Sequence, residues 1–321
     1  MRINKSGFFT VMVLALVVAA TAVAGAASQQ FAAKVNGVGI KTLTLDAAVN
    51  NFIENQKMFG VTVKEEEKGK LRTEILDQLV AAELLYQQSQ KAGLGDLAKQ
   101  ISDEYENIKK GFGSEAEFKK ILKEKSIKEA DLKEDVKKGI YINTFLETKV
   151  FPNLNVTEEA KKQEYETNKD KLNVPESVRA SHILIKAAAD ANEEVKKAAK
   201  DKIEALRQRL AAGEDFAALA KENSEDGTAS NGGDLGYFKR GDMVKSFEDV
   251  AFTMEKDQIS AVIETQFGYH VLKVMDKKPA RTLTYEEVSE DIGKFLLNKL
   301  KRDEVNKVVE SLKKTAKIEM L

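Results

Sequence analysis

The chain has 321 residues, and its 51 Lys and Arg residues against 52 Asp and Glu residues give a formal net charge of −1 at neutral pH. This balance argues against a general nucleic-acid binder and against a membrane-surface protein, because both classes need an excess of basic side chains. The chain contains no cysteine, so it has no disulfide framework, and it is long enough to bury hydrophobic cores without one.

Residues 1–26 have the pattern of a secretory signal peptide. Arg2 and Lys5 precede an apolar run that ends in the small residues AGAA. A positive start, an apolar centre and an Ala-x-Ala site are typical of a cleavable signal, and we expect cleavage after Ala26. The alternative is an uncleaved membrane anchor, since the run approaches the ~20 residues that span a bilayer. The cysteine that bacterial lipoproteins carry just after the signal is absent from the sequence, which favours a soluble periplasmic protein.

Residues 27–174 are predicted to form a helical domain that begins with one short strand region. That region covers residues 31–40, and its Asn36-Gly37 pair indicates a turn. From residue 45 to residue 149, apolar residues recur at three- and four-residue spacing. This spacing predicts several amphipathic helices, which must pack together because such helices gain most of their stability from tertiary burial.

Residues 175–278, which lie between Pro175 and Pro279, have a different pattern. Both histidines of the chain fall here, His182 in the run RASHILIK and His270 in the run GYHVLKVMD. These short, largely apolar runs predict β-strands. Two helical stretches and a glycine-rich loop separate them, so the order of elements predicts an α+β domain with an antiparallel sheet.

The glycine-rich loop, residues 223–252, has the composition of a binding loop. Five glycines lie within fifteen positions between Gly227 and Gly241, so the backbone can adopt positive φ angles and pass close to other groups. Leucine, methionine and aromatic residues alternate with these glycines. A solvated loop has no need of so much apolar surface, and we therefore expect the loop to hold an apolar group.

Residues 279–321 are predicted to form one long amphipathic helix, over about 285–314, followed by a strand over 316–321. The apolar stripe of this helix must be buried. We expect the segment to return to the N-terminal helices and its last strand to pair with residues 33–40. The helical domain would then be built from both chain ends, with the second domain inserted between them.

Residues 178–277 resemble the parvulin family of peptidyl-prolyl cis/trans isomerases. The resemblance is carried by the ordered combination SHILI, NSEDGTASNGGDLGYF, FEDVAF and TQFGYHVLKV. The preceding strand region, with VNGVGI, and the helices after it resemble the N-terminal chaperone domain of exported SurA- and PrsA-type isomerases. Together these resemblances imply a parvulin-like domain, with a four-stranded antiparallel sheet and helices, inserted into a helical chaperone domain.

The function implied by the resemblance is that of an exported foldase. Such a protein isomerises X-Pro peptide bonds in unfolded or folding proteins and also binds these client proteins, with outer-membrane protein precursors as one candidate class. The alternative is a non-catalytic periplasmic chaperone that uses the parvulin-like module only to bind peptides.

The resemblance also implies two sets of site residues. The apolar pocket for the prolyl ring falls on Leu235, Phe238, Met243 and Phe247. The polar floor of the site falls on His182, Asp226, Thr265 and His270. We expect the polar set to shape the pocket and to tune the polarity around the twisting amide, with no acid–base step. Ordinary core packing is the alternative role for both sets.

No cofactor and no metal are expected. Two histidines and an aspartate could bind a divalent ion, but the sequence has no HxxxH or HExxH spacing and no cysteine. The region after His182 also lacks the cluster of arginines by which some parvulins bind phosphate. We therefore expect no preference for phosphorylated peptides and no nucleic-acid partner.

Overall fold

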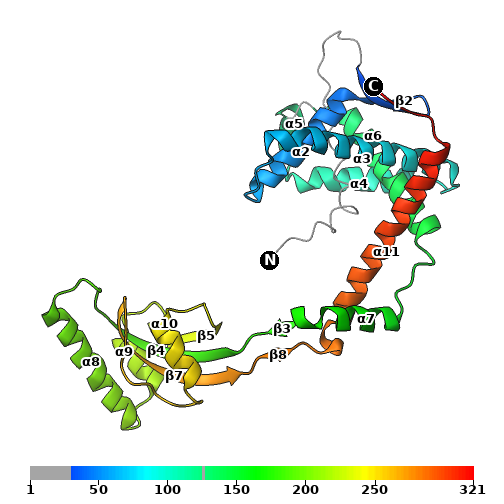
Figure 1. Ribbon diagram of the computed structural model, residues 1–321. Coiled ribbons are helices and arrows are strands. Elements are labelled where there is room, and N and C mark those ends of the chain that lie inside the picture. Colours follow the sequence, from blue (N-terminus) through cyan, green and yellow to red (C-terminus); the bar gives the residue numbers. More distant parts are fainter. Residues whose placement is uncertain (1–29, 125–126) are drawn as a thin grey trace. The chain divides into compact units, whose positions relative to one another are not determined.

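The computed structural model describes residues 30–124 and 127–321, so the predicted signal peptide lies outside the described residues. The chain divides into two compact units. One contains the described residues up to Lys161 together with Asp291–Leu321, and the other is Lys162–Glu290. The predicted fold class is confirmed, because the first unit is mainly helical, is built from both ends of the chain, and receives the second unit as an insertion (Figure 1).

The first unit begins with a hairpin, to which the end of the chain adds a third strand. Strands β1 (Phe31–Val35) and β2 (Val38–Lys41) pair across the predicted turn, where Asn36 and Gly37 have positive φ angles. Strand β9 (Ile318–Met320) pairs antiparallel with the other edge of β1, and Ala33 lies opposite Met320. The predicted pairing of the last strand with the first is thus confirmed, and Figure 1 shows the C-terminus beside β2.

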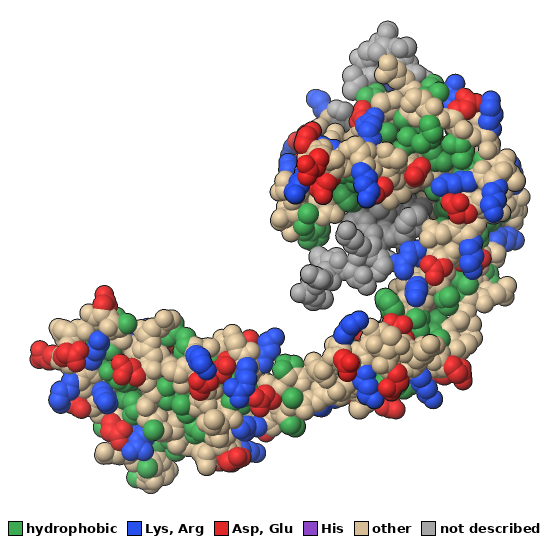
Figure 2. Space-filling view, in the orientation of Figure 1, with side chains coloured by type: hydrophobic (Ala, Val, Ile, Leu, Met, Phe, Trp, Pro, Cys, Tyr) green, Lys and Arg blue, Asp and Glu red, His purple; other side chains and the backbone are tan. Residues whose placement is uncertain are grey.

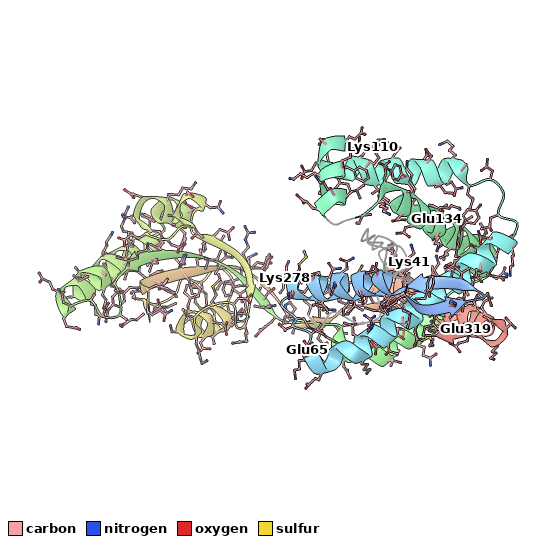
Figure 3. The ribbon with its side chains drawn as sticks, turned by 90° about the horizontal axis from the view of Figure 1, so that it is seen from above. Lys41, Glu65, Lys110, Glu134, Lys278 and Glu319 are labelled. Atoms are coloured by element: carbon pink, nitrogen blue, oxygen red, sulfur yellow. The ribbon has the colours of Figure 1, made fainter. Side chains whose placement is uncertain are left out.

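Helices make up the rest of the first unit. They are α2 (Thr42–Met58), α3 (Glu65–Lys91), α4 (Ala98–Gly111), α5 (Glu115–Glu124), α6 (Glu129–Phe145), the π-helix η2 (Leu146–Val150), and most of α11 (Tyr285–Thr315). Their apolar stripes form shared cores. In one core, Leu85 of α3 and Ile142 of α6 pack with Val305 of α11. In another, Tyr105 of α4 packs with Leu132 of α6; Figure 3 labels Lys110 on α4 and Glu134 on α6.

Helix α7 (Glu158–Asn168) and the short 3₁₀ helix η3 (Lys169–Lys171) lead into the second unit. The paired strands β3 (Asn173–Val174) and β8 (Arg281–Thr282) flank its main sheet in the sequence. That sheet consists of β4 (Ser177–Lys186), β5 (Asp234–Lys239), β6 (Ile263–Thr265) and β7 (Gly268–Lys278). Its order is β5-β4-β7-β6 and every pairing is antiparallel, as predicted.

The sheet of the second unit carries a hydrophobic core on each face. Alternate residues of β4 and β7, such as Ile183 and Val271, pack against α8 (Glu193–Ala211) and α9 (Phe216–Asn223). The intervening residues, such as Ala180 and Leu272, pack against α10 (Lys245–Thr253). Figures 1 and 3 show the sheet running between these helices. Because side chains alternate between the faces of a strand, the sequence pattern determines which residues face α10.

Charged side chains of both signs are interspersed over the drawn face of each unit (Figure 2), in keeping with the small net charge of the chain. None of the helices in the described ranges is long and apolar enough to cross a membrane.

Candidate active site

The two histidines of the chain meet on the face of the sheet that α10 covers. In the register of β4 and β7, His182 lies opposite Leu272 and His270 lies opposite Leu184, so the two histidines are diagonal neighbours on one face. Their Nδ1 atoms are 3.2 Å apart and their ring planes differ by 21°. Both side chains are buried. At this distance one Nδ1 must carry a hydrogen and the other must accept it.

Two further polar side chains extend this pair at both ends. The hydroxyl of Thr265, at the end of β6, lies 2.8 Å from Nε2 of His270. The carboxylate of Asp226 lies 3.1 Å from Nε2 of His182, although the two atoms are not aligned as a hydrogen bond. The four polar residues predicted for the floor of the site therefore lie in one row, in the order Asp226, His182, His270 and Thr265.

One arrangement of hydrogens suits this row best. A hydrogen on Nε2 of His182 faces the carboxylate of Asp226, so Nδ1 of His182 accepts from Nδ1 of His270. Nε2 of His270 then accepts from the hydroxyl of Thr265. The reverse arrangement would turn a nitrogen lone pair of His182 towards a negative carboxylate, which is unfavourable. The geometry thus favours one set of hydrogen positions for the two imidazoles.

The electrostatic environment also keeps His270 neutral. Burial, and after it the neighbouring His182, lower the pKa of His270 to about 4, while Asp226 acts in the opposite direction. Partial burial alone would raise the pKa of Asp226, but hydrogen bonds from the hydroxyl and the amide of Thr228, together with the nearby His182, outweigh it. The pKa of Asp226 therefore lies below its usual range, and this carboxylate is ionised at neutral pH.

The segment before Asp226 is held along the end of β4. The amide of Leu184 donates to the hydroxyl of Ser224 at 3.1 Å, and the amide of Glu225 donates to the carbonyl of Leu184 at 2.8 Å. The carboxylate of Glu225 also accepts from the amide of Lys186. Ser224 and Glu225 thus position Asp226 beside His182. We did not identify either residue from the sequence, where only their place in the NSED segment distinguishes them.

The apolar side of the site is formed by α10 and the loop before it. The ring of Phe247 is edge-on to both imidazoles, with centroids 5.5 Å from His270 and 5.8 Å from His182. Leu235 and Met243 are partly buried against the hydrophobic core that contains Phe247. The ring centroids of Phe238 and Phe247 are 6.2 Å apart, and each of the two side chains is 3% exposed. The structure therefore brings the predicted apolar residues together in one core.

A buried carboxylate joins the two parts of this apolar wall. Glu248, which follows Phe247 in α10, accepts a hydrogen bond from the amide of Gly241 at 2.5 Å. Gly241 lies in the loop two residues before Met243. Glu248 thereby fixes the loop that carries Met243 to the helix that carries Phe247. The position of Glu248 in the sequence does not reveal this contact. Within the described ranges, no three His, Asp, Glu or Cys side chains are placed to bind a metal ion.

Comparisons with known protein families define the class of protein to which this fold and site belong. Residues 163–278 match the PPIC-type PPIase domain, and residues 1–146 match the SurA-like N-terminal domain. The chain is therefore a parvulin-type peptidyl-prolyl isomerase joined to a SurA-like chaperone domain. This confirms both resemblances seen in the sequence.

Similar proteins of known name identify the family within this class. Foldase protein PrsA of Caldanaerobacter subterraneus subsp. tengcongensis is 34% identical over 250 residues, which cover 78% of this chain and 70% of the relative. Foldase protein PrsA of Geobacillus sp. (strain WCH70) is 32% identical over 258 residues, which cover 79% of this chain and 81% of the relative. The chain thus belongs to the PrsA foldase family. A solved structure from work on the SurA-like chaperones PEB4 and Cj1289 of Campylobacter jejuni covers 90% of this chain and 99% of its own, with 26% identity and a TM-score of 0.46.

Proposed function

We propose that this protein is an exported foldase that catalyses the cis/trans isomerisation of X-Pro bonds in unfolded or partly folded exported proteins, with outer-membrane protein precursors as one class of client. The sequence pattern of residues 1–26 and the family of the chain support export. We assign it to the periplasm, with no nucleic-acid partner and no preference for phosphorylated peptides. Detection of the processed protein in a periplasmic fraction, with a new N-terminus at Ala27, would test the location.

The chemistry of this reaction suits the site, because no bond is broken. Rotation of an amide crosses a barrier of ~18–20 kcal/mol that arises from its partial double-bond character. At the twisted transition state the amide loses charge separation, so an apolar, water-poor environment stabilises it relative to either planar isomer. We assign the prolyl ring to Leu235, Met243 and Phe247, with Phe238 as their support.

The single observation that carries this proposal is the row of polar groups beneath Phe247. Two imidazoles joined at 3.2 Å, and bonded at one end to Thr265, offer a polar floor whose one ionised member, Asp226, lies at the far end. Such a floor can hold the shape of the site beside the twisting amide. Asp226 fixes the tautomers from the other end. We propose that these four residues are the polar part of the active site.

Replacing Met243 with alanine should lower kcat/KM for an unphosphorylated X-Pro peptide by about tenfold, because the prolyl ring loses one apolar wall. Met254→Ala is the matched control, since Met254 packs against the same hydrophobic core but follows the far end of α10. A protease-coupled or NMR exchange assay would compare the two variants. Equal activities would contradict the assignment of the pocket, and an unmodified protein with no activity on any X-Pro peptide would favour the non-catalytic alternative.

The chaperone activity proposed for the first unit requires an accessible apolar surface. Met58, the last residue of α2, is 82% exposed, and in the loop that follows it Phe59 is 71% exposed and Val61 is 50% exposed. An apolar group of this kind on a soluble domain commonly marks a site of interaction. We propose that these three residues, the α2–α3 tip, contact unfolded client segments.

The double variant Met58→Gln, Phe59→Gln should therefore suppress the aggregation of an unfolded client less well, requiring several times more protein for the same protection. Its control is Val195→Gln with Met275→Gln, which changes two exposed apolar residues of the other unit. Light scattering of a diluted, denatured client would measure the difference. Equal protection by both double variants would remove the α2–α3 tip from the client-binding surface.

We also propose that the functional domains follow the predicted limits, with a signal peptide over 1–26, a chaperone domain over 27–174 completed by 279–321, and an isomerase domain over 175–278. The pairing of β3 with β8 directly outside the isomerase limits supports this division. Limited proteolysis followed by mass spectrometry should show cleavage concentrated near these boundaries.

A further inference from the structure

Strand β7 contains an extra residue that changes which of its side chains face α10. In the register of β4 and β7, Ala180 lies opposite Val274. The preceding residue of β4, Arg179, lies opposite Asp276, so Met275 has no partner in the ladder. An extra residue of this kind is a β-bulge, and it re-aims the side chains beyond it because the alternation between the two faces of the strand is shifted by one position.

The bulge turns Lys277 towards α10. Val274, just before the bulge, packs in the core that α10 covers, so strict alternation would place Asp276 on that face as well. Beyond the bulge, Lys277 lies opposite Val178, which belongs to the same core. The side chain of Lys277 is therefore on the α10 face. Asp276 is left on the other face, where it accepts a hydrogen bond from the hydroxyl of Tyr237.

The ammonium group of Lys277 holds the C-terminal end of α10. Its Nζ donates to the carbonyl of Phe252 and to the carbonyl of Met254, each at 2.9 Å, and the side chain is half-buried. Phe252 lies in the last turn of α10, and Met254 directly follows the helix. A helix leaves its last carbonyls without partners of its own, and a positive charge at this end also interacts favourably with the helix dipole. Lys277 thus ties the end of α10 to β7.

The placement of α10 determines where Phe247 lies. The helix has nine residues, and Phe247 and Phe252 are only about one and a half turns apart, so they move together. The ring of Phe247 is edge-on to His270, with centroids 5.5 Å apart. At the start of α10, the hydroxyl of Ser246 donates to the carbonyl of Glu264 at 3.1 Å. Since α10 is held at both ends, release of its C-terminal end would let the Phe247 ring move relative to the imidazoles.

We propose, resting on the isomerase function proposed above, that Lys277 is a positioning residue for the reaction. It acts through α10, by keeping Phe247 at a fixed distance from His182 and His270. The space between Phe247 and the imidazoles is where the prolyl amide twists, so a displaced ring fits the transition state less well. The bulge at Met275 is the feature of β7 that directs Lys277 to this task.

The test combines activity with a spectroscopic readout of the site. Lys277→Met removes both hydrogen bonds and keeps an unbranched side chain. Its kcat/KM for an unphosphorylated X-Pro peptide should fall about five- to tenfold, as expected for a small misplacement of a wall of the site. The ring carbon–hydrogen signals of His182 and His270 in NMR spectra should shift, because they lie within reach of the ring current of Phe247. Lys277→Arg, which can donate to both carbonyls, should restore both values.

Lys278→Met is the matched control (Figure 3). Lys278 is the next residue along β7 and is exposed, and its ammonium lies 3.8 Å from the ring centroid of Tyr237. This variant therefore loses a contact of its own on the opposite face of the strand. Its kcat/KM and its histidine signals should equal those of the unmodified protein.

A role in stability alone would lower the Tm of Lys277→Met but leave its histidine signals and its kcat/KM unchanged, and this result would overturn the inference. So would a change in only one of the two readouts, because the inference links the rate to the place of Phe247. If Lys277→Met does not fold, Lys277→Gln replaces it. Its shorter, uncharged amide can serve one carbonyl, so smaller changes in both readouts are expected, and unchanged values would reject the positioning role. If the unmodified protein isomerises no X-Pro peptide, the proposed function itself fails.

Discussion

Replacing Gly233 with alanine is expected to destabilise the second unit by more than about 3 kcal/mol and to remove most isomerase activity. Gly233 has a φ angle of +76°, and a Cβ there would lie 2.1 Å from the carbonyl oxygen of His182. That oxygen belongs to the backbone of β4 and cannot rotate away. The amide of His182 also donates to the carbonyl of Gly233 at 2.9 Å. Any shift that relieves the clash therefore displaces the His182 ring from His270.

Gly236→Ala is a closely matched control. Gly236 has a similar φ angle of +68°, but a Cβ there would have no described heavy atom within 4 Å apart from its chain neighbours. The substitution should cost only the strain of a left-handed alanine, about 1–2 kcal/mol. Urea unfolding of the full chain, with hydrogen exchange read on β4 and β7, would separate the two variants. Equal losses of stability would show that the close approach at His182 places no constraint on the fold.

The strand pattern of the sequence was sufficient to predict the strands that carry the two histidines. In β4 and β7 the apolar residues are nearly continuous, because α8, α9 and α10 cover both faces. The strand β9 could also be predicted, since Ile318 and Met320 alternate with other residues, and its pairing with β1 was expected because the apolar stripe of the preceding helix must be buried. These features depend on local periodicity, which a single sequence contains.

Contacts that depend on strand register could not be predicted in this way. A slip of one residue between β4 and β7 would turn one histidine to the opposite face, so the 3.2 Å contact between the imidazoles follows only from the observed pairing. The same limit applies to Phe238 and Phe247. Both were predicted as pocket residues, and only the packing of α10 on the sheet shows that Phe247 lies edge-on to the imidazoles while Phe238 packs against Phe247.

Residues that act through backbone contacts were missed for a related reason. Ser224 and Glu225 hold the segment before Asp226 by bonding to the main chain of β4. Glu248 holds the amide of Gly241. Polar residues of these types are common in loops and in the first turns of helices. Their sequence positions therefore do not reveal that a distant backbone group is the partner.

The stability of the second unit should fall as the pH is lowered from about 6.5 to about 4. The folded state holds the pKa of His270 at about 4, chiefly through burial, against 6.5 for an unperturbed histidine. Within this window the unfolded chain binds a proton at this position and the folded chain does not, so stability rises with pH. A difference of this size corresponds to ~3 kcal/mol, present in full above pH 6.5 and lost by pH 4.

Carboxyl groups titrate near the lower end of this window, and their effects can be separated from that of His270. The folded state also lowers the pKa of Glu225 and, to about 2, that of Glu287, both in the second unit, so their contribution is lost only as the pH falls below the ordinary glutamate pKa of 4.5. The pKa of Asp226 lies below its usual range, so loss of its contribution begins only below the ordinary aspartate pKa of 3.8. Burial raises the pKa of Asp135, in the first unit, to about 7. Protonation of Asp135 therefore stabilises that unit as the pH falls, which is the opposite sign. Hydrogen exchange read on β4 and β7 reports the second unit alone.

A direct titration gives the sharpest test, because the chain has only two histidines. The ring carbon–hydrogen signals of His270 in NMR spectra should stay in the neutral position down to about pH 5 and then shift with a midpoint near 4. His270→Asn supplies the assignment and should flatten the dependence of stability on pH between 4 and 6.5. A midpoint near 6.5 would mean that the imidazole is hydrated in the folded state, and the polar floor could then not contain the neutral, buried His270 on which the proposed catalysis depends.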